Sequence, residues 1–108
     1  MFIESFKSMQ KRVTDISNSH GWVVTRENLL EKILLMHTEL SEAVESLRLG
    51  DPPSDHIPSF SGVEEEFADV IIRIMSVAEQ LELRVAEAIE AKTDFNKTRS
   101  YKHGGKLF

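Results

Sequence analysis

Residues 64–75 read EEEFADVIIRIM, three glutamates followed by one of the most apolar stretches in the chain. The apolar side chains of this segment and its flanks cover nearly the whole circumference of a helix, and a helix that is apolar all round is buried. One polar stripe interrupts this surface, because Glu66, Asp69 and Arg73 follow at steps of three and four and share a helix face. Buried charges are costly unless they are paired or bound to a metal. The stretch therefore predicts a core helix whose carboxylates have a partner.

The bulk properties of the chain narrow the possible partners. The chain has 108 residues, a net charge of −5 and no cysteine, which fits one domain over residues 1–108. The negative charge argues against binding of a nucleic-acid polymer, because such binders carry a basic patch. The lack of cysteine excludes thiolate zinc sites and favours a cytoplasmic protein, and no segment has the roughly 20 apolar residues of a membrane span. A domain this short buries only a modest core alone, so an oligomer would help it.

Helical spacing of apolar residues dominates the whole sequence, and strand signals are weak. Thr25 is the expected N-cap of the second helix, and Gly50 with the following prolines ends it. Ser61 and Glu64 fit a capping box at the start of the third helix. An unbroken helix beyond Leu81 would exceed the usual length, so a tight break is expected near residues 82–83. The sequence predicts an all-α, four-helix-bundle-like fold with helices at about 2–17, 26–49, 62–81 and 84–97.

A second pair of carboxylates, Glu39 and Glu42, lies on the second helix, again at a spacing of three. Two helices joined by one loop pack antiparallel, so this pair could face Glu66 and Asp69. Four converging carboxylates would repel one another without a cation, and oxygen ligands suit Mg²⁺ or Mn²⁺. A di-iron bundle would need Glu-x-x-His, which is missing here. Two plainer interpretations stay open, namely a salt bridge from Asp69 to Arg73 and a solvated face for the first pair.

These motifs carry a resemblance to a known family. The order E-x-x-E, then 23 residues, then E-x-x-D resembles the signature of the MazG-like, all-α nucleoside triphosphate pyrophosphohydrolases, and it stands here as Glu39-Leu-Ser-Glu42 and Glu66-Phe-Ala-Asp69. A third block, K-x-x-x-N-x-x-R, matches at Lys92, Asn96 and Arg99. The tail SYKHGGKLF is similar to that of small MazG-like proteins, although these often have proline where Ser100 stands. The resemblance covers roughly residues 20–108.

The resemblance implies a specific reaction. Family members use Mg²⁺ to hydrolyse a nucleoside triphosphate between the α and β phosphates, which gives a nucleoside monophosphate and pyrophosphate. Carried over to this chain, the Mg²⁺ ligands are Glu39, Glu42, Glu66 and Asp69, with Mn²⁺ as a possible substitute. Members are dimers or tetramers with the site often near a subunit interface, and many remove unwanted or excess nucleotides. One carboxylate can serve as general base, and Glu39 is the favoured one.

Substrate-binding residues are expected near the C-terminus and before the second helix. Lys92, Asn96 and Arg99 form one stripe, whose cations would hold the β and γ phosphates; otherwise they stabilise the negative end of a helix. Trp22, the only tryptophan, either stacks on a base or covers the core. Lys102, beside Gly104 and Gly105, is a further candidate for a phosphate contact.

Two rival interpretations remain at this stage. In the first, the chain is a non-enzymatic helical interaction module whose carboxylates form structural ion pairs. In the second, it is a related helical hydrolase that acts on a phosphoribosyl nucleotide. The preferred base and sugar, and the choice between dimer and tetramer, do not follow from the sequence.

Overall fold

The structure, a computed structural model, describes residues 1–99 and is all-helical over that part of the chain. Its four helices are α1 (Phe2–Ser19), α2 (Leu29–Arg48), α3 (Gly62–Leu81) and α4 (Val85–Lys97). The bounds of α3 match the expected ones, and α1 extends two residues further than expected. The all-α prediction is confirmed.

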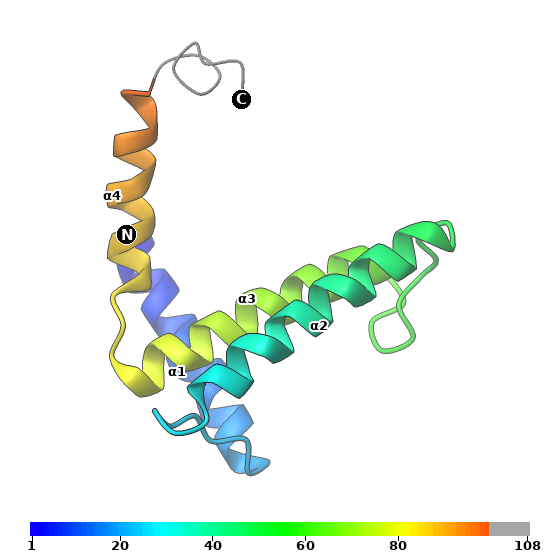
Figure 1. Cartoon of the computed structure of the whole chain (residues 1–108), viewed down its shortest axis with the longest axis horizontal. Helices are drawn as coiled ribbons and strands as arrows, with labels where there is room; N and C mark the ends of the chain where they lie inside the picture. Colours follow the sequence, from blue (N-terminus) through cyan, green and yellow to red (C-terminus); the bar gives the residue numbers. More distant parts are fainter. Residues whose placement is uncertain (100–108) are drawn as a thin grey trace.

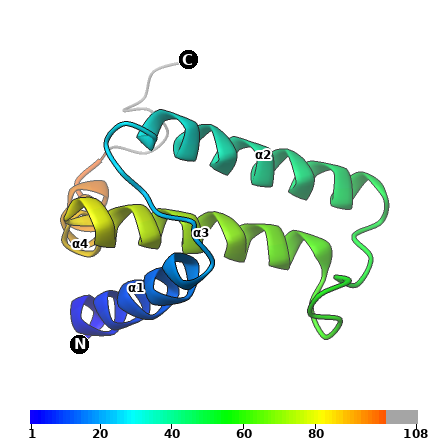
Figure 2. The same ribbon diagram turned by 90° about the horizontal axis from the view of Figure 1, so that it is seen from below.

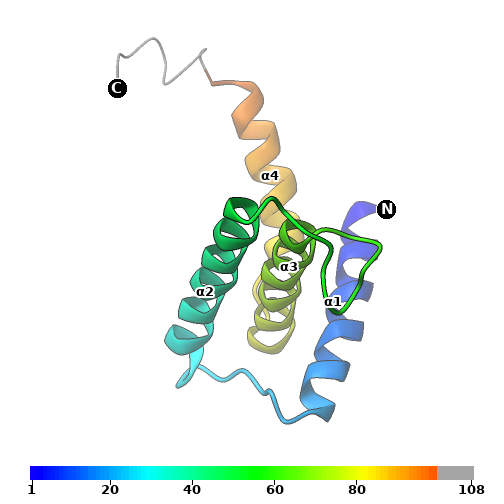
Figure 3. The same ribbon diagram turned by 90° about the vertical axis from the view of Figure 1, so that its right-hand side faces the viewer.

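The central element is α3, which lies between α1 on one side and α2 on the other (Figures 2 and 3). A single loop over residues 49–61 joins α2 to α3, and these two helices run antiparallel, side by side, along most of their length (Figure 1). By contrast, α4 packs on α1 and leads away from the α2–α3 pair (Figure 1). The carboxylates of α2 and α3 are therefore carried by the most closely paired helices of the molecule.

Local signals at the helix ends were correct at α3 and wrong at α2. At α3, the Ser61 side chain accepts a hydrogen bond from the Glu64 backbone N–H, and the Ser61 N–H donates to the Glu64 carboxylate, which completes the expected capping box. At α2, the N-cap is Asn28 rather than Thr25. Thr25 and Asn28 exchange side-chain hydrogen bonds with each other's backbone N–H groups, at 2.8 and 3.2 Å. Thr25 thus caps a turn that precedes the helix, which shortens α2 by three residues at its start.

The loop between α2 and α3 is anchored at several points to the start of α3. Ser54 is buried and its hydroxyl donates to the Glu65 carboxylate at 2.5 Å, while the Asp51 carboxylate accepts the Val63 N–H at 2.9 Å. A Cβ added at Gly62 would lie 2.1 Å from the Ser46 Oγ atom. A side chain at position 62 would force the Ser46 hydroxyl to move, so the absence of one allows the start of α3 to approach α2 closely.

The core of the single chain contains only small or flexible apolar side chains. The buried apolar residues are Val13, Val24, Ala43, Met75, Val77, Ala78 and Ala86, and no leucine, isoleucine or phenylalanine is buried within residues 1–99. The expectation that α3 is buried all round is therefore wrong for one chain, since Phe67 is 52 % and Ile71 50 % exposed.

The apolar stripe of α2 faces away from α3. Ala43, which is buried, and the partly buried Lys32, Leu35 and Glu39 mark the side that packs on α3. The apolar residues that recur at helical spacing along α2 are expected to face the core, but Ile33, Leu40, Val44 and Leu47 remain exposed, and only Leu29 and Met36 are partly buried. The reason is that α2 directs its carboxylates inward, and its apolar stripe lies on a different side of the helix.

Among the helices of residues 1–99, none is both long enough and apolar enough to cross a bilayer.

Candidate metal centre

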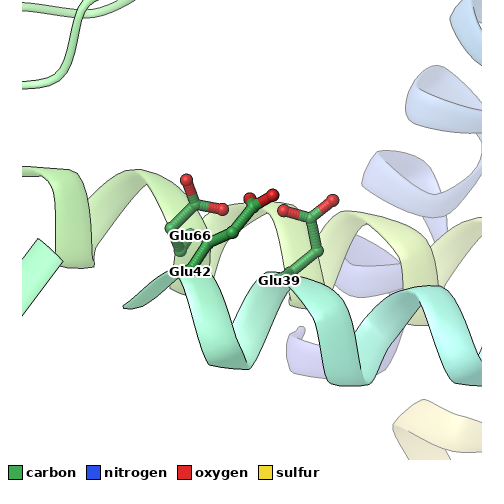
Figure 4. A group of neighbouring side chains, drawn as sticks. All are labelled: Glu39, Glu42 and Glu66. Atoms are coloured by element: carbon green, nitrogen blue, oxygen red, sulfur yellow. The ribbon is translucent and has the colours of Figure 1, made fainter. Parts of the chain in front are cut away.

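Three carboxyl groups converge between α2 and α3. Glu39 and Glu42 project from α2 and meet Glu66 from α3 (Figure 4). One carboxylate oxygen from each of the three lies within 4.8 Å of the others. The spacing of three places the two α2 residues on adjacent turns of one face, and the antiparallel packing brings Glu66 opposite them. The expected convergence of the two motifs therefore occurs for three of the four carboxylates.

The environment of Glu66 disfavours its charged form in the absence of a cation. Burial and the neighbouring carboxylates of Glu39 and Glu42 raise the pKa of Glu66 to about 8. Its Oε2 atom is buried and has no hydrogen-bond partner among the described residues. A buried polar atom without a partner is costly, and a divalent cation would satisfy it and the repelling charges together. The donor set, oxygen only and partly buried, fits Mg²⁺ or Mn²⁺.

Arg73 provides the only cation that contacts the cluster within residues 1–99. Its Nε and Nη2 atoms donate to the Glu39 Oε1 atom at 3.1 and 2.9 Å. The expected alternative, a pair between Asp69 and Arg73 within α3, is therefore replaced by a pair between α3 and α2. Burial on its own would raise the pKa of Glu39, but hydrogen bonding with Glu66 and the Arg73 guanidinium outweigh burial and lower it.

Asp69 stands one turn beyond Glu66 on α3 and is not part of the group of three. It lines a cavity together with Glu39 and Arg73. Burial and the negative charges of Glu39 and Glu65 raise the pKa of Asp69. The structure thus places the fourth predicted ligand outside the group of three, in the lining of the adjoining cavity.

This cavity has a volume of about 460 Å³, within the range of small-molecule sites. Its walls are largely apolar, with Trp22, Val24, Leu35, Ile72 and Val77 among them. Trp22 is 64 % exposed, so it does not cover the core, and it lines the same cavity as Glu39 and Asp69. The interpretation of Trp22 as a core cover is therefore disfavoured.

Sequence reasoning missed one charged residue of the cavity. Lys32 lines the cavity with Glu39 and Arg73. It precedes Glu39 by seven residues, which is two helical turns, so both side chains project from the same face of α2. The spacing of seven could have identified Lys32 from the sequence. It does so only once Glu39 is known to lie on the face of α2 that packs on α3.

The expected phosphate-binding stripe is not brought to the carboxylates within one chain. Lys92, Asn96 and Arg99 lie along and just after α4, which leads away from the α2–α3 pair (Figure 1). The Lys92 ammonium lies 4.5 Å from the Phe95 ring centroid, and Lys92 lines a separate groove at the start of α4. Lys102, the last expected substrate contact, lies outside the described residues.

Comparisons of the chain with models of protein families, with curated proteins and with solved structures find no significant match.

Proposed function

We propose that the chain is a Mg²⁺-dependent nucleoside triphosphate pyrophosphohydrolase, which cleaves a ribo- or deoxynucleoside triphosphate between the α and β phosphates. The observation that carries the proposal is the convergence of Glu39, Glu42 and Glu66 beside a cavity of about 460 Å³. An acidic cluster alone has many explanations. A cluster with a buried, unpartnered carboxylate oxygen and an adjoining apolar cavity supports a metal site that serves a ligand.

The roles of the residues follow from their positions. Glu39, Glu42 and Glu66 would hold Mg²⁺ or Mn²⁺, with Asp69 beside them. The bound ion would neutralise charge on the phosphate oxygens and lower the pKa of a bound water. Trp22 would stack on the base at the apolar side of the cavity. Glu39 suits the role of ligand better than that of general base, because a base needs a pKa near the working pH and that of Glu39 is lowered.

A second copy of the chain is part of the proposal. The faces of α2 and α3 carry exposed apolar side chains, including Val44, Leu47, Phe67 and Ile71. A homo-oligomer would cover them, since exposed apolar patches mark interaction sites. Because α4 leads away from its own carboxylates, we assign Lys92, Asn96 and Arg99 to the phosphates of a site in a neighbouring copy. A cytoplasmic house-cleaning role on unwanted or excess nucleotides is the biological expectation.

The alternative with specific support is a non-enzymatic helical interaction module. The Arg73–Glu39 ion pair and the exposed apolar faces are what such a module would present. This alternative predicts that the carboxylates affect stability but bind no divalent ion, so it is separable by experiment.

The deciding experiment measures pyrophosphate release with Mg²⁺ across ribo-, deoxy- and modified nucleoside triphosphates and a phosphoribosyl nucleotide. The wild type should release monophosphate and pyrophosphate, and Glu39→Ala should lose at least about 100-fold in rate, because it removes a metal ligand. Asp69→Ala, at the margin of the cluster, should lose roughly 10- to 100-fold. Glu45→Ala, an exposed glutamate of α2 outside the cluster, is the matched control.

Melting temperature measured with and without Mg²⁺ completes the test, because an ion that binds only the folded state stabilises it. No release from any substrate, together with no shift on addition of Mg²⁺, would contradict the proposal and favour the interaction module. Release from the phosphoribosyl nucleotide alone would replace the substrate class while retaining the metal site.

A further inference from the structure

Arg73 stands between the metal cluster and the cavity. Its two hydrogen bonds to Glu39 both end on the Oε1 atom. The Glu39 side chain is 13 % exposed, whereas that of Arg73 is 38 % exposed. The guanidinium is thus anchored at one edge and accessible at the other.

Arg73 also lines the adjoining cavity, where its remaining donors are available to a ligand. A guanidinium has five N–H donors, and the bonds to Glu39 use two of them. Arg73 lines the cavity together with Lys32 and Trp22, and also with the carboxylates of Glu39 and Asp69. An anion would therefore bind beside the two cations only once a divalent ion neutralises the carboxylates. Arginine is well suited to phosphate because its planar fork donates two parallel hydrogen bonds.

The hydrogen bonds from Arg73 engage the Glu39 carboxylate, which is also a proposed metal ligand. Glu39 is one of the three carboxylates whose oxygens lie within 4.8 Å of one another. A divalent ion bound there would lie close to the guanidinium, and like charges at such distances repel one another. In the metal-free protein, Arg73 therefore acts as a counterion to Glu39, and an entering ion competes with it.

We propose that Arg73 is an internal counterion that couples metal binding to phosphate binding. It pairs with Glu39 in the metal-free protein, opposes the entering divalent ion, and turns its guanidinium to the phosphate of a ligand in the cavity once the ion has replaced it. The inference rests on the proposed function for the identity of that ligand. It makes phosphate binding and metal binding mutually dependent, since a linkage between two sites is reciprocal.

The competing roles for Arg73 make different predictions. If it only positions Glu39 as a ligand, removing it weakens metal binding. If it only joins α2 to α3, removing it lowers stability and leaves metal binding unchanged. If Arg73 is a counterion that competes with the metal, removing it makes metal binding tighter.

The first measurement titrates Mn²⁺ into the full chain by calorimetry, with no nucleotide present. Arg73→Gln should bind Mn²⁺ about fivefold more tightly than the wild type, since it removes a competing ion pair of this exposure. Arg73→Lys keeps the charge but loses the two-pronged contact, and should fall between the two. Arg12→Gln, which removes an exposed cation from α1, should match the wild type and controls for net charge. Melting curves identify any variant that fails to fold.

The second measurement uses inorganic tripolyphosphate, which needs no choice of base, titrated as its Mn²⁺ complex into Mn²⁺-saturated protein. Arg73→Gln should bind it about 10- to 100-fold more weakly than the wild type, because a charged hydrogen bond is lost. Weaker Mn²⁺ binding by Arg73→Gln, or unchanged binding of both ligands, would overturn the inference alone. A wild type that binds no Mn²⁺ would contradict the metal site and the proposed function as well.

Discussion

Among single residues, Glu66 controls how the metal-free protein responds to pH. Burial and the carboxylates of Glu39 and Glu42 raise the pKa of Glu66 from its ordinary value of 4.5 to about 8. The folded chain therefore holds this proton more strongly than the unfolded chain. The resulting stability is fully present below pH 4.5 and is lost as pH rises through about 8. The lowered pKa of Glu39 acts in the opposite direction, but in a window below its ordinary value of 4.5.

Replacing Glu66 by glutamine should remove most of this pH dependence. In EDTA, the melting temperature of the wild type should fall between pH 5 and pH 8.5, while that of Glu66→Gln should stay nearly level. At pH 8 the variant should be more stable by about 1 kcal/mol, or roughly 4–8 °C for a domain of this size. Circular dichroism melting curves measure both effects.

Glu90→Gln is the matched control for this experiment, because Glu90 is an exposed glutamate of α4 away from the cluster. Parallel pH profiles for Glu66→Gln and the wild type would contradict the assignment. Mg²⁺ should reverse the order of stability above pH 8, because the ion binds the wild-type carboxylate and not the amide.

At the level of elements, helix starts depend on side chains that satisfy free backbone N–H groups. The Ser61–Glu64 capping box was predictable because both partners lie within four residues of each other. At α2, Thr25 finds a reciprocal partner in Asn28, so it closes a turn rather than the helix. The sequence shows both candidates for the cap, and only the backbone path after Trp22 decides between them.

The capping box makes a testable contribution to the start of α3. Ser61→Ala should destabilise the protein by about 1 kcal/mol, the usual cost of losing an N-cap side chain. Chemical denaturation should show a lower midpoint with an unchanged slope. Ser8→Ala, at an exposed position inside α1, is the control and should not lower the midpoint. An equal effect of both substitutions would mean that the cap contributes nothing specific.

For the whole molecule, the main feature is that α2 turns its carboxylates toward α3 while much of its apolar surface faces outward, with Glu39 partly buried and Glu42 exposed. Turning Glu39 and Glu42 toward α3 leaves Leu34, Val44 and Leu47 exposed at 58 %, 58 % and 66 %. Burial of apolar surface stabilises a protein by about 25 cal/mol per Å². The exposed apolar side chains of α2 and α3 contribute little of this stabilisation in a single chain. A second copy would recover this surface and bring its α4 near the site.

Size measurement by light scattering should therefore give at least twice the monomer mass of 12.3 kDa. Leu47→Lys should shift the protein toward the monomer and reduce activity together, because it places a charge in the proposed interface. Leu49→Lys is a matched control, since Leu49 is 69 % exposed but lies on the opposite side of the helix from Leu47. A wild type that is monomeric at micromolar concentration would contradict this arrangement.

Much of the architecture was accessible from local patterns. The apolar periodicity, the glycine and prolines after α2, and the Ser61 cap predicted four helices in the right places. The reversal at Glu82 was expected from length alone, and there the backbone enters the left-handed region at φ 57° without glycine. The direction of α4 after that reversal could not be predicted, because it follows from packing on α1.

The sequence by itself determined which carboxylates share a helix face, because a spacing of three along one helix fixes their relative direction. Only the tertiary structure decided that Glu66 joins Glu39 and Glu42, that Asp69 faces the cavity and that Arg73 pairs with Glu39. The physical reason is that these contacts depend on the rotation and axial offset of α2 against α3. Both are constrained by the anchored loop and the close approach at Gly62, which no periodicity within a single helix encodes.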